Sequence, residues 1–239
     1  MRKILIFAII TCFFTLSCKK KTVTTTTAAT TFLNSTAGSV WNYKTYDSTT
    51  SQETTYSLTS TNMDSMVNGR IYHVFSNTSQ SGTTSEYYNI TGNEYYQYAE
   101  VIPQQSAIEQ KYLIDNVNTG TSWTTPFFTQ IDVQGNAVTI TGTIKNTIEE
   151  KGGSLSLNGT NYNNIIKVKT ELLNVSISVP IIGNLTPTIV QNSHSYYAPK
   201  YGMVKKDLQL QVSVDVPTMG TQEVINTNTS TILMYSTIL

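Results

Sequence analysis

The residue with the best-defined chemistry is Cys18, which follows an apolar run and precedes three lysines. Arg2 and Lys3 give the chain a basic start, and residues 4–14 form an apolar segment of the length found in export signals. A thiol at the end of such a segment can accept a diacylglycerol group, and cleavage before it exposes an amine for a further acyl chain. We therefore predict a signal peptide at residues 1–17 and lipidation of Cys18.

The only other cysteine, Cys12, lies inside the apolar segment and leaves with it. Cys18 then remains as a single thiol, so the mature chain can form no internal disulfide. An exported chain without disulfides depends on its hydrophobic core for stability. The apolar segment is also shorter than the roughly 20 residues that a membrane-spanning helix needs.

The stretch Thr15-Leu16-Ser17-Cys18 resembles the processing site of bacterial lipoproteins, and its Ser-Cys-Lys-Lys ending resembles the relaxed sites of Bacteroidota lipoproteins. This resemblance implies a palmitate-bearing anchor that holds the chain to a membrane. Lys19 stands where an aspartate would retain an enteric lipoprotein in the inner membrane, so the resemblance favours the outer membrane. Residues 19–22 lack the acidic residues that resemble a surface-export signal, so a periplasmic and a surface-exposed domain both remain open.

The two histidines, His73 and His194, are the other candidates for chemistry. His73 lies in the strand-like stretch 70–75, and neither histidine has carboxylates at metal-ligand spacing nearby. Glu149 and Glu150 are adjacent, so on a strand they point to opposite faces and form no acid–base pair. No nucleophile elbow, Ser-x-x-Lys or His-Glu-x-x-His motif occurs. We predict no enzyme activity, no cofactor and no metal site, and a hydrolase with an unrecognised site is the remaining alternative.

Tyrosine is unusually frequent, and several of the 15 tyrosines form doublets. On a strand each doublet places one ring on each face. Inward rings fill a core, whereas outward rings could stack on sugars or line a groove. We take Tyr87, Tyr88, Tyr196 and Tyr197 as candidate ligand-contact residues, with packing between neighbouring strands as the alternative.

Two short stretches are candidates for modification. Asp47-Ser48-Thr49 and Asp64-Ser65-Met66 resemble the O-glycosylation site of Bacteroidota, which is Asp, then Ser or Thr, then a small apolar residue or Thr. The resemblance makes Ser48 and Ser65 candidate O-glycosylation sites.

Composition indicates the elements that position these residues. After residue 21 the chain is rich in Thr, Ser, Asn, Tyr, Ile and Val, which suit strands and tight turns. Residues 18–31 read as a Lys- and Thr-rich tether, and residues 32–239 as a single all-β domain. Ten basic and fifteen acidic residues follow residue 21, a balance of five negative charges that argues against a nucleic-acid partner.

Turn signals and alternation divide the domain into strands. Asn68-Gly69 and Asn158-Gly159 each predict a two-residue hairpin. Residues 137–144 alternate strictly, as a half-buried strand does, and Pro126 predicts a break in the strand 123–133.

Several of these signals occur twice in the same order, which predicts two diverged repeats with chance recurrence as the alternative. The pairs are Gly38-x-x-Trp41 with Gly120-x-x-Trp123, Asn68-Gly69-x-x-Tyr72 with Asn158-Gly159-x-x-Tyr162, and Ser85-x-Tyr87-Tyr88 with Ser195-Tyr196-Tyr197. Each half is too small to enclose a full core, so the halves would share one interior. We predict a curved antiparallel sheet that forms an open or closed barrel, with a β-sandwich as the runner-up. Alternation puts apolar side chains inward in a filled and in a hollow barrel alike.

The whole pattern resembles a group of Bacteroidota lipoproteins of unassigned role. The shared features are Gly-x-x-Trp-x-Tyr at 38–43, Gly-x-x-Trp at 120–123 and Tyr-x-x-x-x-Gly-x-Val-Lys at 197–205. Such chains are similar to curved-sheet lipoprotein carriers, whose concave face holds an apolar ligand. The predicted acyl anchor, the all-β domain and the absence of a catalytic motif together predict a non-enzymatic, membrane-anchored domain that binds a hydrophobic ligand, a glycan or an envelope protein. A structural or adhesive envelope component is the alternative.

Overall fold

The fold is given by a computed structural model, which describes residues 31–100, 107–133, 136–180, 182–217 and 220–239. Cys18, the predicted signal peptide and nearly all of the predicted tether lie outside these residues. The described part of the chain contains no helix that is long and apolar enough to cross a membrane.

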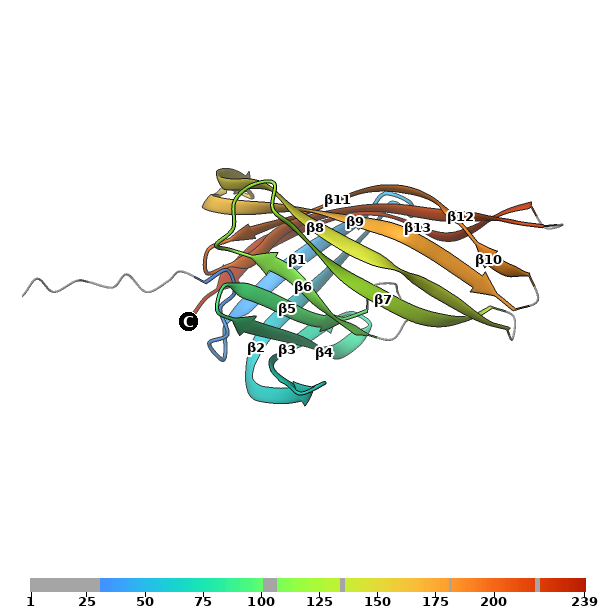
Figure 1. Cartoon of the computed structure of the whole chain (residues 1–239). Coiled ribbons are helices and arrows are strands. Elements are labelled where there is room, and N and C mark those ends of the chain that lie inside the picture. Colours follow the sequence, from blue (N-terminus) through green and yellow to red (C-terminus); the bar gives the residue numbers. More distant parts are fainter. Residues whose placement is uncertain (1–30, 101–106, 134–135, 181, 218–219) are drawn as a thin grey trace, which may run out of the picture.

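The described chain folds into strands that pair antiparallel throughout (Figure 1). The strands are β1 (Val40–Asp47), β2 (Gln52–Val67), β3 (Arg70–Ser79), β4 (Gly82–Thr91), β5 (Glu94–Ala99), β6 (Ile108–Ile114), β7 (Ser122–Val133), β8 (Asn136–Leu157), β9 (Thr160–Val179), β10 (Gly183–Leu185), β11 (Thr188–Ala198), β12 (Gly202–Val216) and β13 (Gly220–Thr237). Both expected Asn-Gly hairpins form: Asn68 and Gly69 have φ values of 51° and 81°, which is the left-handed region that a tight hairpin turn requires.

The strand order repeats. Along the sheet the order is β6-β5-β4-β3-β2-β1 followed by β13-β12-β11-β9-β8-β7, and β10 pairs only with β9. Each half is therefore a six-stranded meander, and both halves have the same strand order along the sheet. The halves meet where β1 pairs with β13. This arrangement is the internal repeat that the recurring Gly-x-x-Trp and Asn-Gly signals predict.

The backbone reproduces the repeat at the level of single hydrogen bonds. The Gly38 amide donates to the Ser60 carbonyl at 2.9 Å, and the Ser60 amide donates to the Ser39 carbonyl. In the second half the Gly120 amide donates to the Ile148 carbonyl at 2.8 Å, and the Ile148 amide donates to the Thr121 carbonyl. The two glycines have φ values of 88° and 87°, so the same left-handed entry precedes β1 and β7.

The sheet curls until its two ends, β6 and β7, almost meet. Side chains replace backbone pairing there: Trp123 Nε1 donates to the Lys111 carbonyl at 2.7 Å, and Asn146 Nδ2 donates to the same carbonyl at 3.1 Å. The predicted curved antiparallel barrel is confirmed in a nearly closed form, and the β-sandwich alternative is wrong. The predicted break at Pro126 is also wrong: β7 runs through it, which is tolerated because β7 is the last strand in the order.

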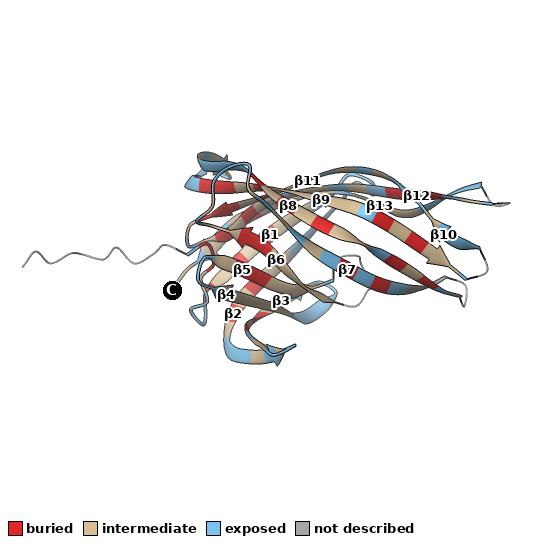
Figure 2. Ribbon diagram, viewed as in Figure 1, coloured by how far each residue is buried: buried red, intermediate tan, exposed pale blue. Residues whose placement is uncertain are grey.

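The interior is packed as two clusters of buried side chains. Figure 2 shows the buried residues in red along the strands. The larger cluster surrounds Trp41, Phe75 and Leu233 and includes residues from both halves. The smaller one surrounds Ile140 and Ile177 in the long strands of the second half. Between them the packing is incomplete, and this gap is where the candidate site lies.

A cavity inside the barrel as the candidate functional site

A cavity of about 280 Å³ lies inside the barrel, where the two buried clusters approach each other. It reaches Tyr112 and Tyr197 of the larger cluster on one side and Ile144 of the smaller cluster on the other. Small-molecule sites occupy roughly 300–1,000 Å³, so this cavity is at the small end of that range. Its lining is Gln97, Ala99, Glu100, Gln110, Tyr112, Ile144, Asn146, Thr170, Leu172, Gln191, Ser193, Ser195, Tyr197, Lys206, Leu208, Leu210, Ile225 and Thr227.

The cavity wall is held in place by amide side chains. Where β9 and β11 diverge, Gln191 takes over the backbone pairing: Leu172 N donates to its Oε1 at 2.6 Å, and its Nε2 donates to the Leu172 carbonyl at 3.0 Å. Near the gap between β6 and β7, Asn146 of β8 is 1% exposed. It donates a hydrogen bond to the Lys111 carbonyl and accepts one from Thr170 at 2.7 Å. The hydrogen bonds of these two amides therefore hold the strands of the cavity wall together.

An aromatic shelf separates this cavity from a second space of about 60 Å³. The rings of Tyr112 and Tyr197 lie 5.4 Å apart with 33° between their planes, and both residues line both spaces. Burial raises the pKa of Tyr112 well above its ordinary value and that of Tyr197 to about 12. Both rings therefore stay neutral at any physiological pH.

Beyond the shelf a half-buried carboxylate is held by hydrogen bonds. Glu86 Oε1 accepts from Asn77 Nδ2 and its Oε2 accepts from the Tyr88 hydroxyl, each at 2.5 Å. Gln97 Nε2 then donates to the Tyr88 hydroxyl at 3.0 Å. Burial first, and the Glu86 charge second, raise the pKa of Tyr88 well above its ordinary value. Both carboxylate oxygens are thus occupied within the barrel.

The cavity also receives a lysine. Lys206 on β12 lines it, in the same phase of the strand as Leu208 and Leu210. The residue is exposed, yet the surrounding barrel wall partly desolvates the ammonium and lowers the pKa of Lys206, and the charge of Glu86 opposes that shift. Sequence reasoning missed Lys206, although the alternation from Val204 to Val214 places this lysine on the apolar face.

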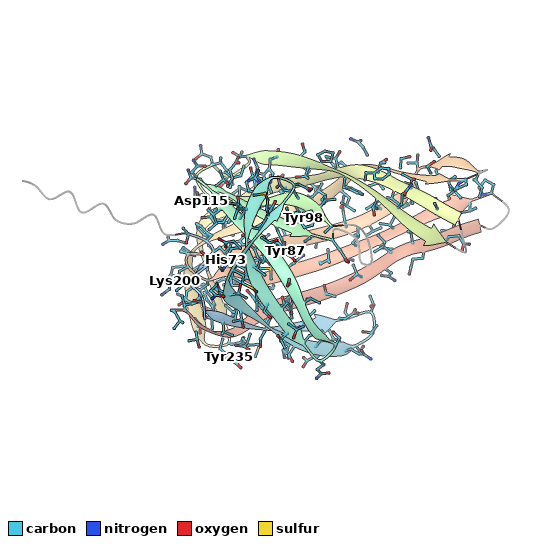
Figure 3. The ribbon with its side chains drawn as sticks, turned by 90° about the horizontal axis from the view of Figure 1, so that it is seen from below. His73, Tyr87, Tyr98, Asp115, Lys200 and Tyr235 are labelled. Atoms are coloured by element: carbon cyan, nitrogen blue, oxygen red, sulfur yellow. The ribbon has the colours of Figure 1, made fainter. Side chains whose placement is uncertain are left out.

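The predicted ligand-contact tyrosines divide between the two faces. Tyr88 and Tyr197 point inward and line the interior spaces. Tyr196 is outside, near the ammonium groups of its neighbours Lys167 and Lys205. Tyr87 is also outside and packs edge-to-face on Tyr98, its directly paired neighbour on β5, at 6.5 Å (Figure 3). The expectation that each doublet faces both ways is confirmed.

Three polar residues of β2 and β3 form a Ser-His-Asp arrangement that no sequence motif predicts. Ser60 Oγ lies 2.9 Å from His73 Nε2, and His73 Nδ1 lies 3.0 Å from Asp64 Oδ1. A bulge in β2 between Ser60 and Asp64 brings them together. The same set serves as a nucleophilic relay in many hydrolases.

The geometry around Ser60 favours a structural role for this arrangement. Ser60 is 1% exposed, and its backbone amide is already bonded to the Ser39 carbonyl, so it offers neither access nor an oxyanion donor. Its equivalent in the second half is the core residue Ile148, which makes the same backbone hydrogen bonds. Ser60 and His73 thus satisfy each other at a core position.

The remaining predicted residues lie apart from the cavity. Ser48 is exposed in the β1–β2 turn and donates to the Asn228 carbonyl at 3.0 Å, and Ser65 is half-buried in β2; glycosylation of either stays a prediction. His194 pairs with Glu149 at 3.0 Å on the outer face of β11. No group of three or more His, Cys, Asp or Glu side chains with metal-binding geometry occurs among the described residues.

Comparison with known proteins supports the fold. No protein-family model matches the chain, and no curated protein matches it. A candidate lipoprotein from Parabacteroides distasonis has a similar crystal structure, with a TM-score of 0.54 and 15% sequence identity over 87% of this chain and 99% of that one. A candidate exported protein with a YmcC-like fold from Bacteroides fragilis aligns with a TM-score of 0.43 and 9% identity over 86% of this chain and 98% of that one. The alignment spans nearly the whole Parabacteroides chain, so the two chains share a fold.

Proposed function

We propose that this chain is a lipid-anchored protein of the bacterial cell envelope whose barrel binds a small ligand in its interior cavity, without catalysing a reaction. The observation that carries the proposal is the cavity of about 280 Å³ between two well-packed clusters. Unfilled volume in a core is costly, since each missing methylene group destabilises the fold. A cavity of this size with a mixed polar and apolar wall is the form that binding sites for small molecules take.

The sequence and the comparison with known structures support a location in the cell envelope. Cys18 follows an apolar export segment, and the Parabacteroides protein of similar fold is itself a candidate lipoprotein. We place the anchor in the outer membrane because Lys19, not aspartate, follows Cys18. Twelve residues, 19–30, lie between Cys18 and Thr31, where the described structure begins.

Filling the cavity should abolish ligand binding. Leu208→Trp adds an indole to the cavity wall, and we expect the affinity for 1-octanol, a neutral amphiphile, to fall at least about tenfold in isothermal titration calorimetry. Val190→Trp is the matched control, because Val190 is 50% exposed and lies outside the cavity lining. If wild type does not bind 1-octanol, or Leu208→Trp binds it as wild type does, the cavity is not a binding site for such molecules.

Lipidation should depend on one cysteine. In cells fed radiolabelled palmitate, Cys18→Ser is expected to abolish labelling of the chain, because the thiol that accepts the lipid is gone. Cys12→Ser is the matched control and should be labelled like wild type, since Cys12 lies within the discarded segment. Persistent labelling of Cys18→Ser would exclude Cys18 as the anchor.

A further inference from the structure

The positive charge of Lys206 indicates which chemical class of ligand the cavity can bind. Lys206 is the only lysine or arginine among the cavity-lining residues. No hydrogen bond or ion pair joins its side chain to another described residue, and the residue is exposed, so its ammonium is accessible from the cavity that it lines. Its neighbour Lys205 shows the contrast: on the outer face, Lys205 Nζ lies 2.8 Å from Asp207 Oδ2 and 5.3 Å from the centre of the Tyr196 ring.

No ion pair joins this ammonium to a carboxylate of the described residues, although Glu100 belongs to the same cavity lining. An ammonium that faces a cavity rather than bulk solvent is stabilised by an anion or by several hydrogen-bond acceptors. Glu86 is the acid whose charge acts on Lys206, but both its oxygens already accept hydrogen bonds from Asn77 and Tyr88. Glu86 also lines the smaller space, on the other side of the aromatic shelf. The lowered pKa of Lys206 agrees with incomplete compensation.

The rest of the wall offers apolar surface next to this charge. Leu208 and Leu210 follow Lys206 along β12, and Leu172 and Ile225 come from other strands around the same cavity. A ligand that fits both parts has one anionic group and a short apolar body. The cavity of about 280 Å³ is at the small end of the range for small-molecule sites, which favours a small molecule or the end of a larger one.

We propose that the cavity selects small amphiphiles with a single anionic group, which pairs with Lys206 while the apolar body lies against the leucines of the wall. This inference rests on the proposed function of the cavity and adds the chemical class of its ligand. A carboxylate and a phosphate ester both meet the requirement, since both present oxygen acceptors and negative charge to the ammonium.

The test compares probes that differ in the head group. Octanoate, octyl phosphate and 1-octanol are titrated by calorimetry into the purified full-length chain carrying Cys18→Ser, which prevents acylation. We expect at least one of the two anions to bind about tenfold or more tighter than 1-octanol, and the ratio between the two anions tells a carboxylate from a phosphate. Lys206→Met should remove this preference while leaving 1-octanol binding within about twofold, and Lys206→Arg should keep it.

Two controls separate this inference from the proposed function. Lys205→Met removes a charge one residue away on the outer face and should change none of the affinities. Equal binding of the anions and 1-octanol by wild type, or unchanged anion preference in Lys206→Met, would overturn the assignment of Lys206 while leaving the cavity a binding site. Absence of binding for all three probes would instead contradict the proposed function itself. Thermal melting of Lys206→Met confirms that the variant is folded.

Discussion

Raising the pH from 9 to 11 is expected to unfold the barrel cooperatively, because four tyrosines inside it resist ionisation. Burial is the main cause that raises the pKa of Tyr43, Tyr88 and Tyr112 well above the ordinary value of 10, and that of Tyr197 to about 12. In the unfolded chain all four hydroxyls ionise near pH 10.

The direction follows from proton linkage. Between pH 10 and the raised values the folded state holds more protons than the unfolded state, so the free energy of unfolding falls as pH rises. The stabilisation is fully present below pH 10 and is lost above it. At pH 11 each group costs about 1.4 kcal/mol, so the four together cost roughly 5–6 kcal/mol against a typical total stability of about 5–15 kcal/mol. Lys206 acts in the opposite sense, since its lowered pKa makes stability rise with pH up to its ordinary value of 10.5.

The measurement is a pH titration followed by tyrosinate absorbance and by far-ultraviolet circular dichroism. The absorbance of these tyrosines should appear together with the loss of β-sheet signal, at one midpoint. Tyr112→Phe removes one of the four groups and should move this midpoint to higher pH by a few tenths of a unit. Smooth tyrosinate formation near pH 10 for all tyrosines, with the sheet signal unchanged, would contradict the expectation.

Replacing Trp41 with alanine is expected to lower the free energy of unfolding by about 3–5 kcal/mol. Trp41 is 1% exposed and packs against Phe75, with ring centroids 5.8 Å apart, in the cluster that joins the two halves. Its indole Nε1 is buried without a hydrogen-bond partner, so the ring contributes through its volume and contacts. Denaturant unfolding monitored by circular dichroism measures the loss.

Trp123 is the matched control, because it holds the equivalent position in the second half. It lies at the gap between β6 and β7 and is only half-buried. Trp41→Phe should cost far less than Trp41→Ala, since no hydrogen bond is lost. Trp123→Phe should cost about 1 kcal/mol, because it removes the bond from Nε1 to the Lys111 carbonyl. A larger loss for Trp123→Ala than for Trp41→Ala would show that this gap, rather than the shared cluster, limits stability.

Local patterns in the sequence predict much of this fold. The Asn-Gly pairs fix the turns at 68–69 and 158–159 because two successive left-handed residues leave few alternatives. Alternation predicts the strands, and the recurring Gly-x-x-Trp predicts the repeat. Closure is harder to predict, because it depends on single long-range contacts such as those of Trp123 and Asn146 with the Lys111 carbonyl.

The site is less predictable than the fold. Alternation assigns the faces of the tyrosine doublets correctly, yet the same alternation holds for a filled and for a hollow interior. In the cavity wall Gln191 spans the point where β9 leaves β11 and Asn146 spans the gap between β6 and β7, and neither role has a local pattern in the sequence. The arrangement of Ser60, His73 and Asp64 likewise arises from a bulge in β2, whose position no turn residue marks.

The pairing of β1 with β13 sets the order in which this chain can fold. Val40 pairs with Thr237, so the first strand synthesised waits for the last one before the two halves are joined. Contacts so distant along the chain carry a large loop-closure entropy and slow folding. Until β13 arrives, β1 presents a row of unpaired backbone groups to which another chain could add. We therefore expect the last strand to set the rate of folding after export, and truncated chains that end before residue 220 to aggregate rather than to fold as a half-barrel.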